Sequence, residues 1–165
     1  MHLANYRGGI IVNKTGKRFV DESLPYKEIG TSALSQPSGV GIMIFDDKIR
    51  SKLENYLLGS HTRLGRLCKE ALTIADLACA IDVPPEALLD TVDTYNGYVE
   101  RRDDLEFGRK ALAGPVGELV KLDTPPYFAF EAVGALIGTY AGLTVDTRTR
   151  VRNVFGEVIP GLYAV

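Results

Sequence analysis

Two residues have potentially reactive side chains and lie at turns, where the backbone would hold them in place. Tyr26 follows Pro25 at a corner, and Arg109 ends the tripeptide Phe107-Gly108-Arg109. A positioned tyrosine can transfer a proton, and an arginine can clamp a carboxylate through two parallel hydrogen bonds. Each has a plain structural alternative, because a tyrosine commonly covers the edge of a core and a loop arginine commonly lies on the surface. The residue types alone leave these alternatives open.

Arg18 and Glu22 form a second candidate group, four residues apart on either side of Phe19. The opposite charges can pair with each other. An ion pair of this kind in solvent is the default interpretation, and it would contribute little to stability.

The sequence lacks the residues that several other kinds of functional site require. The sequence contains no Cys/His cluster for zinc, no nucleophile motif of the G-x-S-x-G type and no Walker-type phosphate loop. No metal site is therefore predicted. No G-x-G-x-x-G follows a strand either, so the dinucleotide fingerprint is absent from these 165 residues.

The composition narrows the class of protein further. The formal net charge of −2 argues against a nucleic-acid partner. No apolar run reaches the length of a membrane span, and residues 1–7 contain no signal-peptide core. Cys68 and Cys79 fall inside apolar helical patterns and are predicted to be buried free thiols. These features predict one cytoplasmic domain over residues 1–165.

The elements that must position Tyr26 begin at Gly8. Residues 9–13 are apolar and β-branched, residues 14–16 supply a turn that ends in glycine, and residues 18–20 are predicted to return as a second strand. A polar exit over residues 21–23 then leads to the corner at Pro25, whose ring fixes the backbone. The second half of this stretch, residues 18–26, contains more potentially reactive side chains than a hairpin requires.

The rest of the chain is predicted to alternate between buried strands and a helical middle. Helices are expected after Asp46 or Asp47, along the apolar stripe from Leu64 to Leu72, from a capping box at Thr73, and from Pro85 to Val99. Further strands are expected over residues 41–45, 127–133, 138–146, 150–154 and 162–165, with a long loop over residues 107–121. The predicted fold class is α+β, a small antiparallel or mixed sheet formed by both chain ends with the helical middle packed on it.

Motifs at both ends of the chain resemble one flavoprotein family. Residues 12–22 match V-N-x-x-G-x-R-F-x-[ND]-E, a pattern of the capping domain in relatives of fumarate reductase and succinate dehydrogenase. The extension Ser23-Leu24-Pro25-Tyr26 is similar to the 3-oxosteroid 1-dehydrogenase branch. Residues 138–146 and 159–164 resemble G-T-x-G-G-L-x-x-D and I-P-G-L-Y-A, and Tyr95-Asn96 and the F-G-R tripeptide fit the family as well.

The resemblance implies a substrate-capping domain that is a fragment of a longer chain. Its expected partners are the missing flavin-binding domain and a small-molecule substrate, and exposed junctions could also support a homo-oligomer. FAD is expected in the full-length protein and is not expected to bind tightly to residues 1–165. This chain alone is therefore expected to be inactive.

The same resemblance implies roles for individual residues. Tyr26 matches a tyrosine that helps to take a proton α to a ketone, and Arg109 matches an arginine that is essential in fumarate-reducing relatives. Gly138, Thr139 and Tyr140 match a turn that contacts substrate, and Arg18 and Glu22 would hold the junction near the flavin. Many dicarboxylate reducers have histidine where this chain has Gly138, so the resemblance favours a bulkier and less charged substrate.

Three functions follow from these expectations. The first is a cap for the addition or removal of hydrogen across a C–C bond next to the carbonyl of a 3-ketosteroid-like substrate. The second is a cap for a fumarate- or succinate-type dicarboxylate enzyme. The third is a non-catalytic module that binds a partner or self-associates, and resemblance alone does not choose among them.

Overall fold

The computed structural model describes residues 4–54, 68–112, 117–134 and 142–164. The chain divides into two compact units, residues 1–134 and residues 135–165. Each unit is described by itself.

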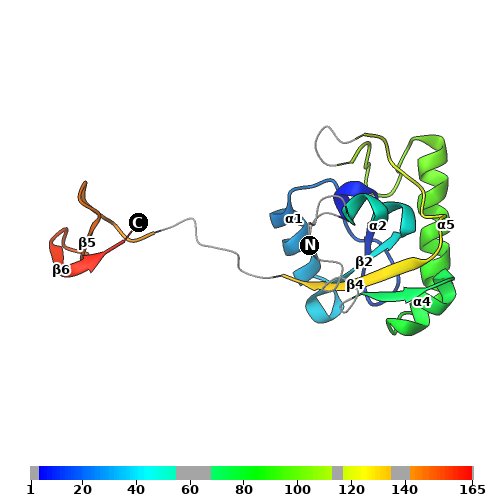
Figure 1. Ribbon diagram of the computed structural model, residues 1–165, viewed down its shortest axis with the longest axis horizontal. Helices are drawn as coiled ribbons and strands as arrows, with labels where there is room; N and C mark the ends of the chain where they lie inside the picture. Colours follow the sequence, from blue (N-terminus) through cyan, green and yellow to red (C-terminus); the bar gives the residue numbers. More distant parts are fainter. Residues whose placement is uncertain (1–3, 55–67, 113–116, 135–141, 165) are drawn as a thin grey trace. The chain divides into compact units, whose positions relative to one another are not determined.

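The first unit is built on a four-stranded antiparallel sheet in the order β1-β2-β4-β3 (Figure 1). Its strands are β1 (Ile10–Val12), β2 (Val40–Asp46), β3 (Lys69–Ala71) and β4 (Tyr127–Val133). The central pair, β2 and β4, aligns seven residues from Val40 opposite Val133 to Asp46 opposite Tyr127. All of β2 after Val40 is buried, as its continuous apolar sequence predicts for a strand covered on both faces.

In the described part of the chain, four helices lie around this sheet, and two short 3₁₀ turns precede β1 and β2. The helices are α1 (Tyr26–Leu34), α2 (Asp47–Glu54), α4 (Ile74–Ala80) and α5 (Pro85–Arg101), and the turns are η1 (Asn5–Arg7) and η2 (Pro37–Gly39). Helix α1 contacts β2 and β4, and α4 contacts β3, β4 and α5, which runs beside it in Figure 1. None of the helices in the described segments is long and apolar enough to cross a membrane.

Two predicted helix starts are confirmed by their caps. The Thr73 hydroxyl accepts a hydrogen bond from the Asp76 amide at 3.1 Å and donates to the Asp76 carboxylate at 2.7 Å. The buried Asp46 carboxylate accepts the Ile49 amide at 3.1 Å, so Asp46 caps α2. These side chains satisfy amides that a helix N-terminus leaves without a partner inside the helix.

Three local predictions are wrong. The predicted helix from Leu64 to Leu72 contains strand β3 at residues 69–71, because this segment pairs with β4, while residues 55–67 lie outside the described part. Residues 18–20 form no second strand. Strand β1 is at the edge of the sheet, and its outer side makes one bridge, from Val12 to Arg18, while its Ile11 amide binds the Glu22 carboxylate and not a second strand. Both cysteines are free, but Cys79 is exposed and Cys68 is only half-buried.

The second unit is a two-stranded antiparallel sheet of β5 (Arg150–Arg152) and β6 (Val158–Tyr163). Side chains close together in the sequence stabilise it. Asp146 pairs with Arg150 at 2.6 Å, and Asn153 accepts the amides of Phe155 and Glu157 in the turn. The α+β class with small antiparallel sheets is confirmed. The sequence predicted one sheet formed by both chain ends. In the structure, the C-terminal strands β5 and β6 pair with each other and form a separate two-stranded sheet.

Candidate functional site

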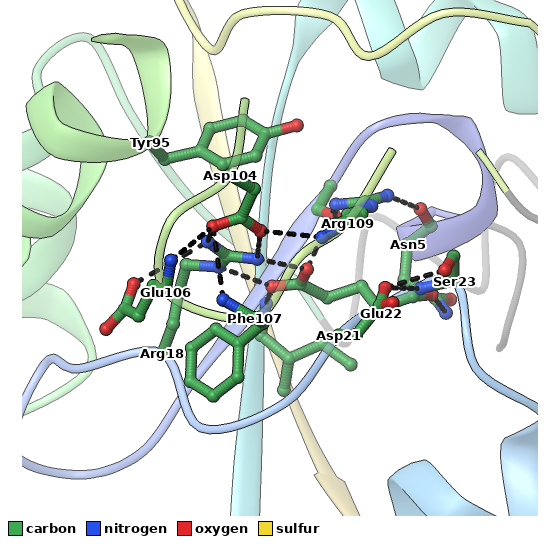
Figure 2. A network of polar contacts seen from close by, with 12 residues as sticks. Asn5, Arg18, Asp21, Glu22, Ser23, Tyr95, Asp104, Glu106, Phe107 and Arg109 are labelled. Atoms are coloured by element: carbon green, nitrogen blue, oxygen red, sulfur yellow. Dashed lines mark hydrogen bonds and ion pairs between the residues drawn. The ribbon is translucent and has the colours of Figure 1, made fainter. Parts of the chain in front are cut away.

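Four charged side chains lie buried together in the first unit. They are Arg18, Glu22, Asp104 and Arg109, and each is at most 4% exposed. Figure 2 shows how they converge from the segment after β1 and from the loop after α5. We call this group the buried ion network.

Glu22 is the centre of the buried ion network. Its carboxylate accepts hydrogen bonds from Arg18 Nε at 2.9 Å and Nη2 at 2.8 Å, and from Arg109 Nη1 at 3.1 Å. It also accepts the Ile11 amide at 3.1 Å, so it satisfies a backbone group of strand β1. The predicted pairing of Arg18 with Glu22 is confirmed, but the default of a surface ion pair is wrong because both side chains are 0% exposed.

Arg18 joins the two carboxylates of the network. Its Nη1 and Nη2 donate to Asp104 at 3.2 and 2.9 Å, while the other donors bind Glu22. The rings of Tyr95 and Phe107 lie 5.2 and 5.0 Å from the guanidinium carbon. Burial opposes the charged form of Arg18, but the hydrogen bonds and charges of Glu22 and Asp104 outweigh burial and raise its pKa.

The guanidinium of Arg109 binds backbone carbonyls of the same domain. It is 1% exposed, and its guanidinium donates to Asn5 O at 2.6 Å, to Gly9 O at 3.1 Å and to Glu22. The preceding Gly108 has a φ of +70°, which turns the loop inward at a residue type that adopts this conformation easily. The alternative of a loop arginine on the surface is therefore wrong. The catalytic role of Arg109 stays a prediction, and these contacts favour a structural role.

Asp104 is not among the candidate residues that the sequence indicated. The residue is 3% exposed and accepts the amides of Glu106, Phe107 and Arg109 as well as the Arg18 guanidinium. An aspartate in a turn commonly accepts the backbone amide two residues on, as Asp104 does with Glu106. This local signal could have indicated that Asp104 caps the loop before the F-G-R tripeptide.

Asp104 should make stability depend on pH. Burial would raise its pKa, but the hydrogen bond and charge of Arg18 and the amides of Phe107 and Glu106 outweigh burial and lower it. A carboxyl with a depressed pKa stabilises the fold above its unfolded pKa of about 4, and this contribution is lost as pH falls through the folded value. We expect Asp104→Asn to be less stable than wild type at neutral pH, with the gap narrowing in acid. Urea midpoints at several pH values would measure it, and a gap that stays constant with pH would contradict it.

The Y-N motif is structural. The hydroxyl of Tyr95 donates toward Gly8 O at 3.4 Å and Val120 O at 3.2 Å, and burial raises the pKa of Tyr95 to about 12. Asn96 binds both backbone groups of Leu122, at 3.0 and 2.8 Å. Together the two side chains fix the segment that leads into β4.

Tyr26 lies apart from these buried groups, at the surface. It is the first residue of α1 and is 45% exposed. The chain reaches it through a turn in which Asp21 accepts the Ser23 amide at 2.8 Å and hydroxyl at 2.6 Å. The predicted substrate-contacting residues Gly138, Thr139 and Tyr140 lie outside the described residues. Within the described segments, no group of three or more His, Cys, Asp or Glu side chains could hold a metal ion.

Residues 3–165 match the protein family described as "FAD binding domain". The chain belongs to this family. NADH:acrylate oxidoreductase of Vibrio harveyi is 34% identical to it over 94% of this chain and 15% of that protein. 4-Oxocyclohexanecarboxylate 2-dehydrogenase of Sinomonas cyclohexanicum is 33% identical over 96% of this chain and 31% of that protein. The chain thus spans a third or less of the length of these relatives.

Two solved structures represent both branches of the predicted resemblance. The open conformation of a flavocytochrome c3 fumarate reductase superposes with a TM-score of 0.83 at 25% identity, covering 99% of this chain and 27% of that one. The 3-ketosteroid Δ1-dehydrogenase of Sterolibacterium denitrificans gives a TM-score of 0.69 at 27% identity, covering 98% and 33%. The resemblance to fumarate reductases and 3-oxosteroid dehydrogenases is confirmed.

The described residues do not fit FAD as a tightly bound cofactor. A dinucleotide pyrophosphate is held at a glycine-rich turn between a parallel strand and a helix, whereas every strand pair described here is antiparallel. Arg18 and Glu22, the residues predicted near the flavin, bind each other and Asp104 or Arg109. Their role toward the flavin stays a prediction, and it would be an indirect one.

Residues 1–165 alone are expected to purify without colour and to bind FAD weakly, because the sequence has no dinucleotide fingerprint. Absorbance spectra after dialysis against FAD-free buffer would check this. A yellow protein that keeps one flavin per chain would contradict it.

Proposed function

We propose that this chain is the substrate-capping part of an FAD-dependent oxidoreductase that adds or removes hydrogen across a C–C bond next to a ketone. A ring ketone similar to a 3-ketosteroid is the proposed substrate class. The family match and the superposition on a 3-ketosteroid Δ1-dehydrogenase support this proposal. The flavin-binding part of the protein is its proposed partner and supplies the two-electron chemistry.

Tyr26 is the proposed proton-transfer residue of this cap. A carbonyl acidifies the hydrogen on its neighbouring carbon, and removal of that proton gives an enolate. A phenolate at Tyr26 would take the proton, and the neutral phenol would return it in the reverse direction.

The observation that carries the ketone assignment is the contrast between Tyr26 and Arg109. Tyr26 is 45% exposed, whereas Arg109 is 1% exposed and donates to two carbonyls and to Glu22. The Nε of Arg109 has no hydrogen-bond partner among the described residues, but the guanidinium is too deeply buried for a substrate carboxylate to reach it without a rearrangement of the domain. A ketone substrate needs a proton-transfer group and has no carboxylate to clamp.

A second candidate is the reduction of an α,β-unsaturated carboxylate. It is supported by the 34% identity to NADH:acrylate oxidoreductase and by the superposition on a fumarate reductase. In that case a group other than Arg109 would bind the carboxylate. The cap would still contribute substrate contacts and exclude water from the reaction.

The two candidates are separated by assays of the full-length flavoprotein that contains this segment. One assay offers a 3-ketosteroid with an artificial electron acceptor, and the other offers fumarate or acrylate with a reduced dye. The proposal expects turnover in the first assay and little in the second. Turnover of the unsaturated acids alone would reject the ketone and support the second candidate.

A further inference from the structure

The corner that carries Tyr26 is tied to a second tyrosine. The hydroxyl of Tyr6, in η1, donates to Leu24 O at 3.2 Å. This bond holds the backbone at Leu24, the residue before Pro25 and two positions before Tyr26.

This contact matters because α1 has no side-chain cap. The residue before the helix is Pro25, whose side chain makes no capping hydrogen bond. The segment that enters the helix is therefore held by groups outside the helix, and the Tyr6 hydroxyl is one of them. Burial raises the pKa of Tyr6, so the hydroxyl keeps its proton and remains a donor to Leu24 O.

Asn5, the residue before Tyr6, also attaches η1 to the segment that leads to Tyr26. Asn5 Nδ2 donates to Glu22 O at 2.9 Å, and Asn5 O accepts from Arg109 at 2.6 Å. Consecutive side chains of η1 therefore bind the backbone carbonyls of Glu22 and Leu24. Since η1 is also fixed to the buried ion network, it can transmit the rigidity of that network to the corner.

We propose that Tyr6 is a positioning residue that sets the location of the Tyr26 side chain through the backbone at Leu24. The proposal rests on the proposed function, because it matters for catalysis only if Tyr26 transfers the proton. Tyr6 itself does not contact the substrate. Its hydroxyl orders the corner, while its ring packs against the hydrophobic core.

The test uses the full-length flavoprotein with Tyr6→Phe, which keeps the ring and removes the hydrogen bond to Leu24 O. We expect kcat to fall by roughly 10- to 100-fold with KM nearly unchanged, because misplacing a reacting group by about 1 Å has an effect of that order. Tyr98→Phe is the matched control. Its hydroxyl has no hydrogen-bond partner among the described residues, and its ring lies 5.4 Å from the Arg101 guanidinium. The control should keep wild-type kcat.

A double-mutant cycle separates positioning from general destabilisation. If Tyr6 acts through Tyr26, adding Tyr6→Phe to Tyr26→Phe should not lower the residual kcat further. An equal loss in both backgrounds, or wild-type kcat in Tyr6→Phe, would overturn the positioning role. Wild-type kcat in Tyr26→Phe would instead reject the proposed function, so the two failures are distinguishable.

Replacement of Tyr6 by 4-aminophenylalanine tests the same contact if Tyr6→Phe fails to fold. This side chain keeps the ring and an N–H donor for Leu24 O. Recovery of most of the wild-type kcat is the expected result. A well-folded protein with wild-type flavin content and a kcat as low as that of Tyr26→Phe would overturn the proposal.

Discussion

Tyr26→Phe is expected to lower kcat of the full-length flavoprotein by roughly 10²–10⁴-fold, the usual effect of removing a positioned acid–base group. Phenylalanine keeps the ring, and at 45% exposure the residue contributes little to the core. Flavin content and thermal stability should therefore stay near wild type. Steady-state kinetics with a 3-ketosteroid, together with flavin absorbance and a thermal melt, would measure all three quantities.

Arg109→Lys is expected to show the opposite pattern to Tyr26→Phe, with a larger effect on stability than on turnover. Lysine places a single ammonium group where a planar guanidinium now reaches Asn5, Gly9 and Glu22. We expect lower stability, with turnover per folded molecule less affected than in Tyr26→Phe. Full activity in Tyr26→Phe beside a collapse of kcat in well-folded Arg109→Lys would reverse the assignment and favour a carboxylate substrate.

Glu22→Ala is expected to destabilise the domain by about 3–5 kcal/mol, because it leaves two buried guanidinium groups without their shared carboxylate. The side chains of Glu22, Arg18 and Arg109 are all 0% exposed, so solvent cannot replace the lost charge without unfolding. The Ile11 amide also loses its acceptor. Since small domains are stable by only about 5–15 kcal/mol, much of the protein should unfold.

The matched control is Asp90→Ala, which removes a carboxylate from a surface ion pair. Asp90 lies 2.7 Å from Lys17, and the two side chains are 67% and 50% exposed. Such a pair is worth at most about 1 kcal/mol. Urea unfolding of both variants would compare the two costs. Equal urea midpoints for Glu22→Ala and Asp90→Ala would contradict the central position of Glu22 in the network.

Much of the fold could be predicted because local signals agreed with tertiary packing. The apolar run of β2, the cap at Thr73 and the proline that begins α5 each specify one structure from neighbouring residues. The helix predicted for the segment before Thr73 was wrong for the opposite reason. Its apolar spacing suits a helix, but residues 69–71 complete the sheet by pairing with β4, and pairing across the sequence overrides local propensity.

The candidate site was only partly predictable. The R-F-x-x-E spacing predicted that Arg18 and Glu22 would pair, but burial depended on Asp104, which is 86 residues from Arg18 in the sequence. Likewise, no local pattern shows that Arg109 would reach Asn5, 104 residues away. The sequence placed Tyr26 at a corner, yet only the structure shows that Tyr6 holds that corner.

Hydrogen exchange at the α carbon of a ketone tests the role of Tyr26 most directly. A ring ketone without hydrogen on the β carbon cannot be dehydrogenated there, but it can still lose its α proton. Full-length wild-type flavoprotein in D₂O should exchange this hydrogen, as followed by NMR, and Tyr98→Phe should match it. Tyr26→Phe should be slower by roughly 10²-fold or more at equal flavin content. Exchange by Tyr26→Phe at the wild-type rate would contradict the proposal that this cap supplies Tyr26 as the proton-transfer group.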